Sequence, residues 1–120
     1  MPNQAELLRK FIDSAQAVIY MKDAEGRFLM VNDHSAELAG TTKEEMIGKT
    51  DYDFYSKENS DMFREMDLSV TAAGKPKVFK FNVQTAEGEI TVVDHKFPVS
   101  VEGSPEAVGG IAIEVTDVDV

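Results

Sequence analysis

A compact run of turn and helix signals between residues 23 and 48 constrains the fold of this chain more than any other feature. Residues 18–21 and 27–31 are short runs rich in β-branched and aromatic side chains, and the turn Asp23-Ala24-Glu25-Gly26 separates them. This pattern predicts a β-hairpin with a four-residue loop, in which Gly26 takes the positive φ that such loops require.

Two very short helices are predicted immediately after the hairpin. Asn32 and Asp33 offer side-chain oxygens that can cap a helix, and Gly40 can end it within about two turns. Thr42 and Glu45 have the spacing of a capping box for a second helix, which Gly48 would terminate.

An amphipathic helix is predicted at the N-terminus and a longer one in the middle of the chain. Residues 3–15 place apolar side chains at helical spacing, and Ser56 and Gly74 are the expected ends of the longer helix. Between the short helices and the longer one, residues 51–55 are expected to form a tight turn. The predicted buried face of the longer helix consists of Met62, Phe63, Met66, Val70 and Ala73.

From residue 76 onward the hydrophobic period changes to two, which indicates antiparallel strands. Phe79, Phe81 and Val83 alternate with polar residues. In the next strand, 90–101, we expect the side of Val93, His95, Phe97, Val99 and Val101 to face inward, with Asp94, Lys96 and Pro98 on the other side. Residues 102–105 are expected to form a loop, and the last strand is expected over 108–118, with close backbone packing at Gly109, Gly110 and Ala112. The expected fold is α+β: a five-stranded antiparallel sheet with helices inserted between strands two and three and packed on one face.

This order of elements resembles the PAS family of sensory domains. The resemblance is carried by Asp23, Gly26, Arg27, Asn32, Leu38, Gly40, Glu44, Glu45, Ile47, Gly48 and Lys49. Later landmarks are residues 65–67, 73–76, 87–88, 96–99 and 110–116, so the likeness covers roughly residues 17–116. Within it, Asp23, Gly26, Asn32, Gly40 and Gly48 are the expected structural motif. The predicted organisation is a flanking helix at 1–16 and a single PAS-like domain at 17–118.

Charge, cysteine content and hydropathy exclude several classes of function. The net charge of −10 opposes binding to nucleic acid or to an anionic membrane surface, and no apolar run approaches the ~20 residues of a membrane span. Because the N-terminal segment also lacks a targeting signal, we expect a cytoplasmic protein. The chain has no cysteine, which excludes disulfides, thiolate nucleophiles and a cysteinyl–flavin adduct.

We expect no haem, flavin or metal. The resemblance implies that a haem ligand would be a histidine of the long helix, which contains none, and that a flavin light sensor would carry an Asn-Cys-Arg-Phe motif, whereas this chain has Asn32-Asp33-His34-Ser35. Asp51, Asp53 and Glu58 lack the glycine and terminal glutamate of a calcium loop. No serine lies in a Gly-x-Ser-x-Gly context, and no catalytic residue is predicted, so we expect a protein that is not an enzyme.

The expected binding site is an apolar cavity between sheet and helices. Its predicted lining is Met30, His34, Phe54, Met62, Met66, Phe79, Phe81, Val93 and His95. Two neutral imidazoles in an apolar lining suit a small, weakly polar or carboxylate-bearing metabolite better than a nucleotide, since no glycine-rich phosphate loop is present.

The resemblance implies a sensory module of a bacterial-type signalling protein, as in two-component systems. Such a module binds a small ligand, forms a homodimer, or does both, and passes a signal to an effector in cis or in trans: a kinase, cyclase, phosphatase or transcription regulator. The expected relay is Glu114, Val115 and Thr116, and the expected dimer interface is Leu7, Leu8, Phe11 and Ile12. The N-terminal helix could equally pack on its own domain.

Two further functions remain open from the sequence. One is a ligand-free dimerisation module with a solid core of Met30, Phe54, Met66, Phe79 and Phe97. The other is an isomerase-like enzyme with a conical α+β fold.

Overall fold

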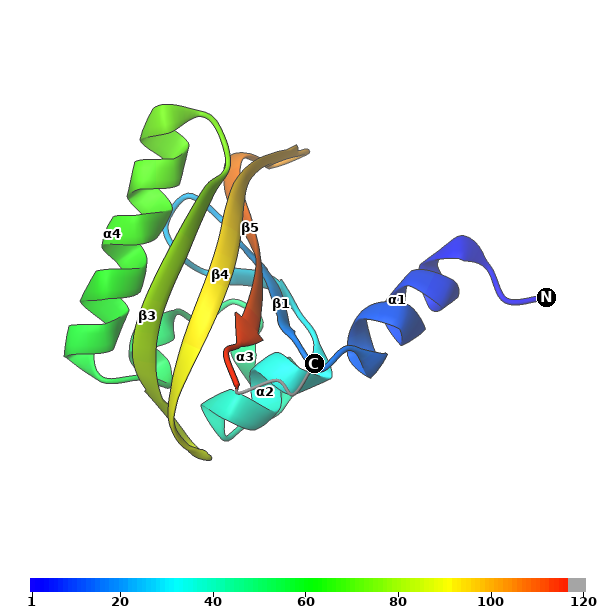
Figure 1. The fold of residues 1–120 in the computed structure, drawn as a ribbon. Coiled ribbons are helices and arrows are strands. Elements are labelled where there is room, and N and C mark those ends of the chain that lie inside the picture. Colours follow the sequence, from blue (N-terminus) through cyan, green and yellow to red (C-terminus); the bar gives the residue numbers. More distant parts are fainter. Residues whose placement is uncertain (117–120) are drawn as a thin grey trace.

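A single antiparallel sheet forms the centre of the structure. The computed structural model describes residues 1–116. Its five strands are β1 (Val18–Lys22), β2 (Phe28–Val31), β3 (Lys77–Thr85), β4 (Gly88–Val101) and β5 (Ser104–Glu114). They are arranged in the order β2-β1-β5-β4-β3, so the first and last strands of the fold are neighbours at its middle (Figure 1). The predicted α+β class and sheet are confirmed.

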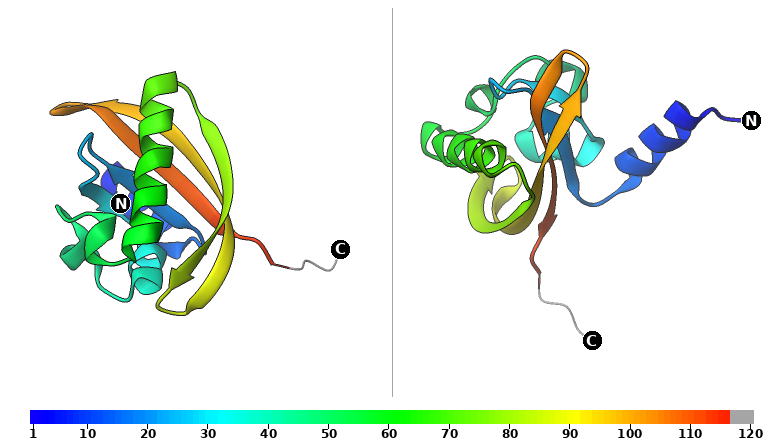
Figure 2. Two further views of the ribbon diagram at one scale, coloured as in Figure 1. Left: turned by 90° about the vertical axis from the view of Figure 1, so that its left-hand side faces the viewer. Right: turned by 90° about the horizontal axis from the view of Figure 1, so that it is seen from above.

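Helices inserted between β2 and β3 cover one face of this sheet. They are α2 (Asp33–Ala39), α3 (Lys43–Met46), the 3₁₀ turn η1 (Asp51–Asp53) and α4 (Lys57–Ala73). The long helix α4 crosses the inner face and contacts β3, β4 and β5, whereas α2 packs on β1 and α3 on β2 (Figure 2). The space that these elements enclose contains the site described below.

The local signals in the sequence produce the predicted caps and turns. The side chains of Asn32, Thr42 and Ser56 each accept a hydrogen bond from the backbone N–H three residues later, at the starts of α2, α3 and α4. Gly40 and Gly74 end α2 and α4 in the left-handed conformation, as predicted. These requirements concern a few neighbouring residues, which is why the sequence alone predicts them.

Asn32 connects three elements rather than only capping a helix. Its side chain is fully buried. Oδ1 accepts from the N–H groups of Ile19 and Ser35 and from the Ser35 hydroxyl, and Nδ2 donates to the carbonyls of Ile12 and Ala17. One side chain therefore joins the end of the N-terminal helix, strand β1 and helix α2.

Strand β4 faces the opposite way from the prediction. Val92, Asp94 and Lys96 are buried against the helices, whereas His95 is exposed on the outer face and Val93 and Phe97 are half-buried. The prediction was wrong because it placed the more apolar residues inside. The two buried charges instead pair with each other and with Asp67 of α4.

Two other boundaries and faces also differ from the prediction. The buried side of α4 consists of Ser60, Phe63, Asp67 and Val70, whereas Ala73 is exposed. Strand β5 begins at Ser104, inside the predicted loop, and ends at Glu114. The predicted end of this strand at Val118 lies outside the described residues.

The N-terminal helix α1 (Gln4–Ser14) projects from the domain on the side of the sheet away from α4 (Figures 1 and 2). None of its residues is buried, and the side chains of Leu7, Leu8 and Phe11 are exposed. Its C-terminal end is held by the Asn32 contact to the Ile12 carbonyl and by the ion pair of Asp13 with Lys43. Leu7, Leu8 and Phe11 therefore do not pack on the helix's own domain, whereas Ile12 is half-buried.

We predict that Asn32→Ala lowers the free energy of unfolding by at least about 2 kcal/mol, because it leaves several buried backbone groups without a partner. Asn3→Ala is the matched control, since Asn3 caps α1 at an exposed position with a single bond to the Glu6 N–H. Its expected cost is about 1 kcal/mol or less. Urea unfolding measures both; equal costs would show that Asn32 acts only as a cap.

Candidate functional site

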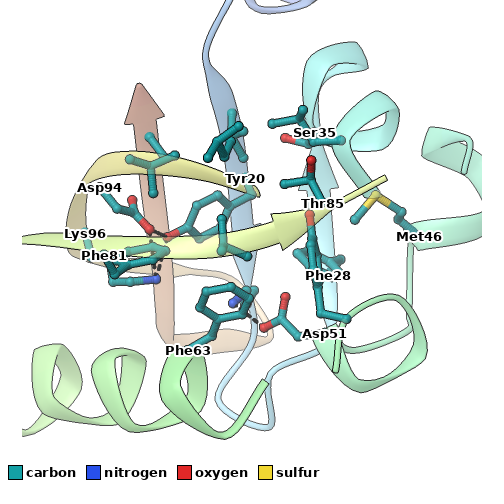
Figure 3. A pocket seen from close by; sticks show the side chains of 18 residues that line it. Tyr20, Phe28, Ser35, Met46, Asp51, Phe63, Phe81, Thr85, Asp94 and Lys96 are labelled. Atoms are coloured by element: carbon teal, nitrogen blue, oxygen red, sulfur yellow. Dashed lines mark hydrogen bonds and ion pairs between the residues drawn. The ribbon is translucent and has the colours of Figure 1, made fainter. Parts of the chain in front are cut away.

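A cavity lies between the inner face of the sheet and the helices (Figure 3). Its volume is about 70 Å³. Its wall is formed by Val18, Tyr20, Lys22, Phe28, Ser35, Leu38, Met46, Asp51, Tyr55, Phe63, Phe81, Val83, Thr85, Ile90, Val92, Asp94, Lys96 and Ala112. Most of this wall is apolar, and the charged side chains come from β1, η1 and β4.

A chain of alternating charges forms the polar end of the cavity. Lys22 Nζ lies 2.6 Å from Asp51 Oδ2 and 2.9 Å from Asp67 Oδ2. Lys96 Nζ lies 2.8 Å from Asp67 Oδ1 and 3.1 Å from Asp94 Oδ2. All five residues are buried, so this chain of ion pairs, which we call the buried ion chain, connects η1, β1, α4 and β4.

Tyr20 closes the end of the buried ion chain. Its hydroxyl donates to Asp94 Oδ2 at 2.8 Å and accepts from Lys96 Nζ at 2.7 Å. Gly110, on the neighbouring strand β5, lies in register between Tyr20 and Lys96, and a Cβ at this position would overlap the Tyr20 ring. The predicted close packing at Gly110 is therefore what allows the Tyr20 ring to cross β5 and reach β4.

The surroundings of Lys22, Asp67 and Tyr20 shift their pKa values. Burial alone would lower the pKa of Lys22, but the charges of Asp51 and Asp67 outweigh it and raise that pKa above its ordinary value. Burial would raise the pKa of Asp67, yet Lys22 and Lys96 hold it below its ordinary value. Burial and the charge of Asp94 raise the pKa of Tyr20 well above its ordinary value.

The lowered pKa of Asp67 has a consequence for stability in acid. The ionised Asp67 carboxylate stabilises the folded state fully at a pH above the ordinary carboxyl pKa of about 4. This stabilisation is lost as the pH falls through the lower pKa that Asp67 has in the folded state.

Of the nine side chains predicted to line a ligand cavity, Phe81 lies in this wall. His95 is exposed on the outer face of β4, and His34 is half-buried on α2, with Nδ1 3.6 Å from Glu37 Oε2. The others are half-buried outside the wall: Met30, Phe54, Met62, Met66, Phe79 and Val93.

The charged residues of the site were missed, although their positions carry a signal. Lys22 continues the alternation of Val18 and Tyr20, and Asp67 lies one helical turn from Phe63 and from Val70. Charged side chains at core positions in several elements, with both signs represented, indicate buried ion pairs.

Two other properties of residues 1–116 bear on function. No helix in this range is long and apolar enough to cross a membrane. Within the same range, no three histidine, cysteine or acidic side chains are grouped so that they could hold a metal ion. The cavity wall therefore offers a bound molecule the polar groups of Tyr20, Ser35, Tyr55 and Thr85 and four members of the buried ion chain: Lys22, Asp51, Asp94 and Lys96.

Sequence comparison identifies the family. The sequence model of the PAS fold family matches residues 12–120. The chain is 30% identical over 92% of its length to the methanogenesis regulatory histidine kinase FilI of Methanothrix harundinacea, of which it covers 12%. It is 34% identical over 92% of its length to probable histidine kinase 1 of Oryza sativa subsp. indica, covering 11% of that protein. The chain thus spans about an eighth or less of these curated relatives.

Solved structures show the same fold. The PAS domain of Bordetella pertussis BvgS is 26% identical, with a TM-score of 0.73 over 97% of this chain and 89% of that one. Vibrio cholerae VqmA, solved in a complex with ligand and DNA, is 19% identical, with a TM-score of 0.83 over 99% of this chain and 54% of that one. This chain belongs to the PAS fold family, and it is homologous to sensor domains of histidine kinases.

We predict that Asp67→Asn lowers the free energy of unfolding by about 3–5 kcal/mol, because it removes the shared partner of two buried lysines. Asp61→Asn is the matched control on the same helix. Asp61 is exposed, and solvent screens its bonds to Lys57 and Tyr52, so its replacement should change the stability little. Urea unfolding at neutral pH compares the two; a small effect of Asp67→Asn would contradict a structural role for the buried ion chain.

Proposed function

We propose that this PAS domain is a small-molecule sensor whose ligand occupies the cavity between the sheet and α4. The observation that carries the proposal is the combination of a cavity of about 70 Å³ with a polar end built from buried ion pairs. Ligand sites are typically apolar pockets in which a few well-placed polar groups provide orientation. The complex of VqmA with a ligand supports a ligand role for a neighbour of the same fold.

The size of the cavity limits the class of ligand. A water molecule needs roughly 10–15 Å³ of such volume, so the space accommodates about five to seven waters or a similar number of non-hydrogen ligand atoms. Haem and flavin are far larger. This supports a compact metabolite as the ligand and a colourless protein.

Strand β5 is the proposed route from the cavity to an effector. Ala112 lines the cavity, and two residues later β5 ends at Glu114, which pairs with Val92 of the cavity wall. Beyond it, the Val115 N–H donates to the Thr91 carbonyl. A ligand that shifts β4 would therefore move the predicted relay Glu114, Val115 and Thr116. Histidine kinases among the relatives make a kinase our proposed effector.

We expect the ligand sensor to respond in a thermal-shift screen of small metabolites. A ligand at a hundredfold excess over its Kd stabilises the folded state by about 2.7 kcal/mol, which is readily measured. Val83→Phe fills the cavity and should abolish the shift, whereas Val78→Phe, on the outward face of the same strand, should retain it.

Native mass spectrometry of protein purified from cells provides a second readout, because a retained ligand would be lost under denaturing conditions. The sensor function is contradicted if no compound shifts the melting temperature and no extra mass is found. It is also contradicted if hits act equally on Val83→Phe.

Dimerisation through α1 is a second proposed function, and it is compatible with the first. The side chain of Phe11 is 74% exposed and that of Leu8 60% exposed. The outer face of the sheet adds exposed Val78, Ile111 and Ile113. A second copy of this chain is the proposed partner of both surfaces, since each is apolar and residues 1–116 cover neither of them. The solved VqmA neighbour is a dimer.

We predict that the wild type is a homodimer at high micromolar concentration and that the double variant Leu7→Glu/Phe11→Glu is a monomer, because two charges would have to be buried in the interface. Leu68→Glu is the control, since Leu68 is an exposed leucine on α4. Analytical ultracentrifugation decides this, and a monomeric wild type would overturn the proposal.

A further inference from the structure

One carboxylate oxygen of the cavity-lining residue Asp94 has no hydrogen-bond partner among residues 1–116. Asp94 projects from β4 into the cavity, and its side chain is 96% buried (Figure 3). Oδ2 accepts a hydrogen bond from the Tyr20 hydroxyl and faces Lys96, but no group in the described part of the chain donates to the buried Oδ1. A buried carboxylate oxygen without a donor is unfavourable, because it has lost its hydration without replacement. A bound molecule with an N–H or O–H group would supply the missing donor.

The charge of the buried ion chain is also unbalanced. Asp51, Asp67 and Asp94 provide three negative charges against the two positive charges of Lys22 and Lys96, which leaves one negative charge in a buried site. Both ammonium groups already lie between carboxylates. An isolated buried charge is costly, and a cation beside it removes that cost.

We infer that the cavity binds a compact monocation, an aliphatic amine or a protonated nitrogen heterocycle, whose N–H donates to Asp94 Oδ1. This inference rests on the proposed sensor function and specifies its ligand class. The apolar part of such a molecule would contact Phe81, Val83 and Val92, which line the cavity around this end. The same excess negative charge disfavours a carboxylate, so this ligand class differs from the weakly polar or carboxylate-bearing metabolite that the sequence suggested.

The test is a titration of ¹⁵N-labelled protein, observed by NMR, with four small probes of similar size. Pyrrolidine is a cation at neutral pH, cyclopentanol is a neutral donor, cyclopentanone is an acceptor only, and butanoate is an anion. Probes this small bind weakly, so dissociation constants on the order of 1 mM are expected for the best of them. Pyrrolidine should bind about tenfold or more tightly than cyclopentanone, and butanoate should not bind.

The variant Asp94→Asn tests whether this carboxylate causes the preference for a cation. It should reduce the affinity for pyrrolidine about tenfold and leave the affinity for cyclopentanol nearly unchanged. Asp61→Asn changes the net charge by the same amount on the exposed side of α4 and should have no effect. The selectivity of the wild type among the four probes tests the inference even where Asp94→Asn does not fold.

Three results would overturn the inference: equal or tighter binding of cyclopentanone or butanoate, unchanged pyrrolidine binding in Asp94→Asn, or no binding of any probe to the wild type. A metabolite of another class that binds the wild type and not Val83→Phe would leave the sensor function standing while this inference fails.

Discussion

The buried ion chain is the interaction on which the rest of the domain depends. Asp67 bridges two lysines from strands on different sides of β5, and it thereby fixes α4 over the centre of the sheet. None of these charges can leave its partners without becoming an uncompensated charge in the interior. The ion pairs of Asp67 therefore hold α4 against β1 and β4 at the charged end of the cavity.

The local structure of this fold could be predicted from the sequence because its causes are local. A cap at Asn32, a left-handed glycine at Gly40 and the alternation of Phe79, Phe81 and Val83 each depend on backbone geometry within a few residues. The order of the elements could also be predicted from such local signals. The resemblance to PAS domains supported the prediction of the complete five-stranded sheet. Phe81 was placed in the cavity wall for this reason, since β3 follows the ordinary rule of apolar residues inside and polar residues outside.

The polar part of the site could not be predicted in this way, because its cause is not local. Asp94 and Lys96 are acceptable in the core only with Asp67, a residue on a different element and 27 positions away from Asp94. Because the prediction placed charged residues outside, it assigned the wrong inward face to β4 and selected His95 and Val93 as cavity residues. The same reasoning gave α4 a partly wrong buried face, because it placed methionines rather than Asp67 on the inner side of the helix.

The pairing of β1 with β5 determines how such a domain can be combined with others. Val18, where the domain begins after α1, lies directly opposite Ala112, near the end of the last strand. The chain therefore arrives and departs at adjacent points, and a domain of this kind can be inserted into a much longer polypeptide without separating the segments on its two sides. A small relative movement of β1 and β5 would displace both the segment before β1 and the segment after β5. This property suits domains that are arranged in series along one polypeptide.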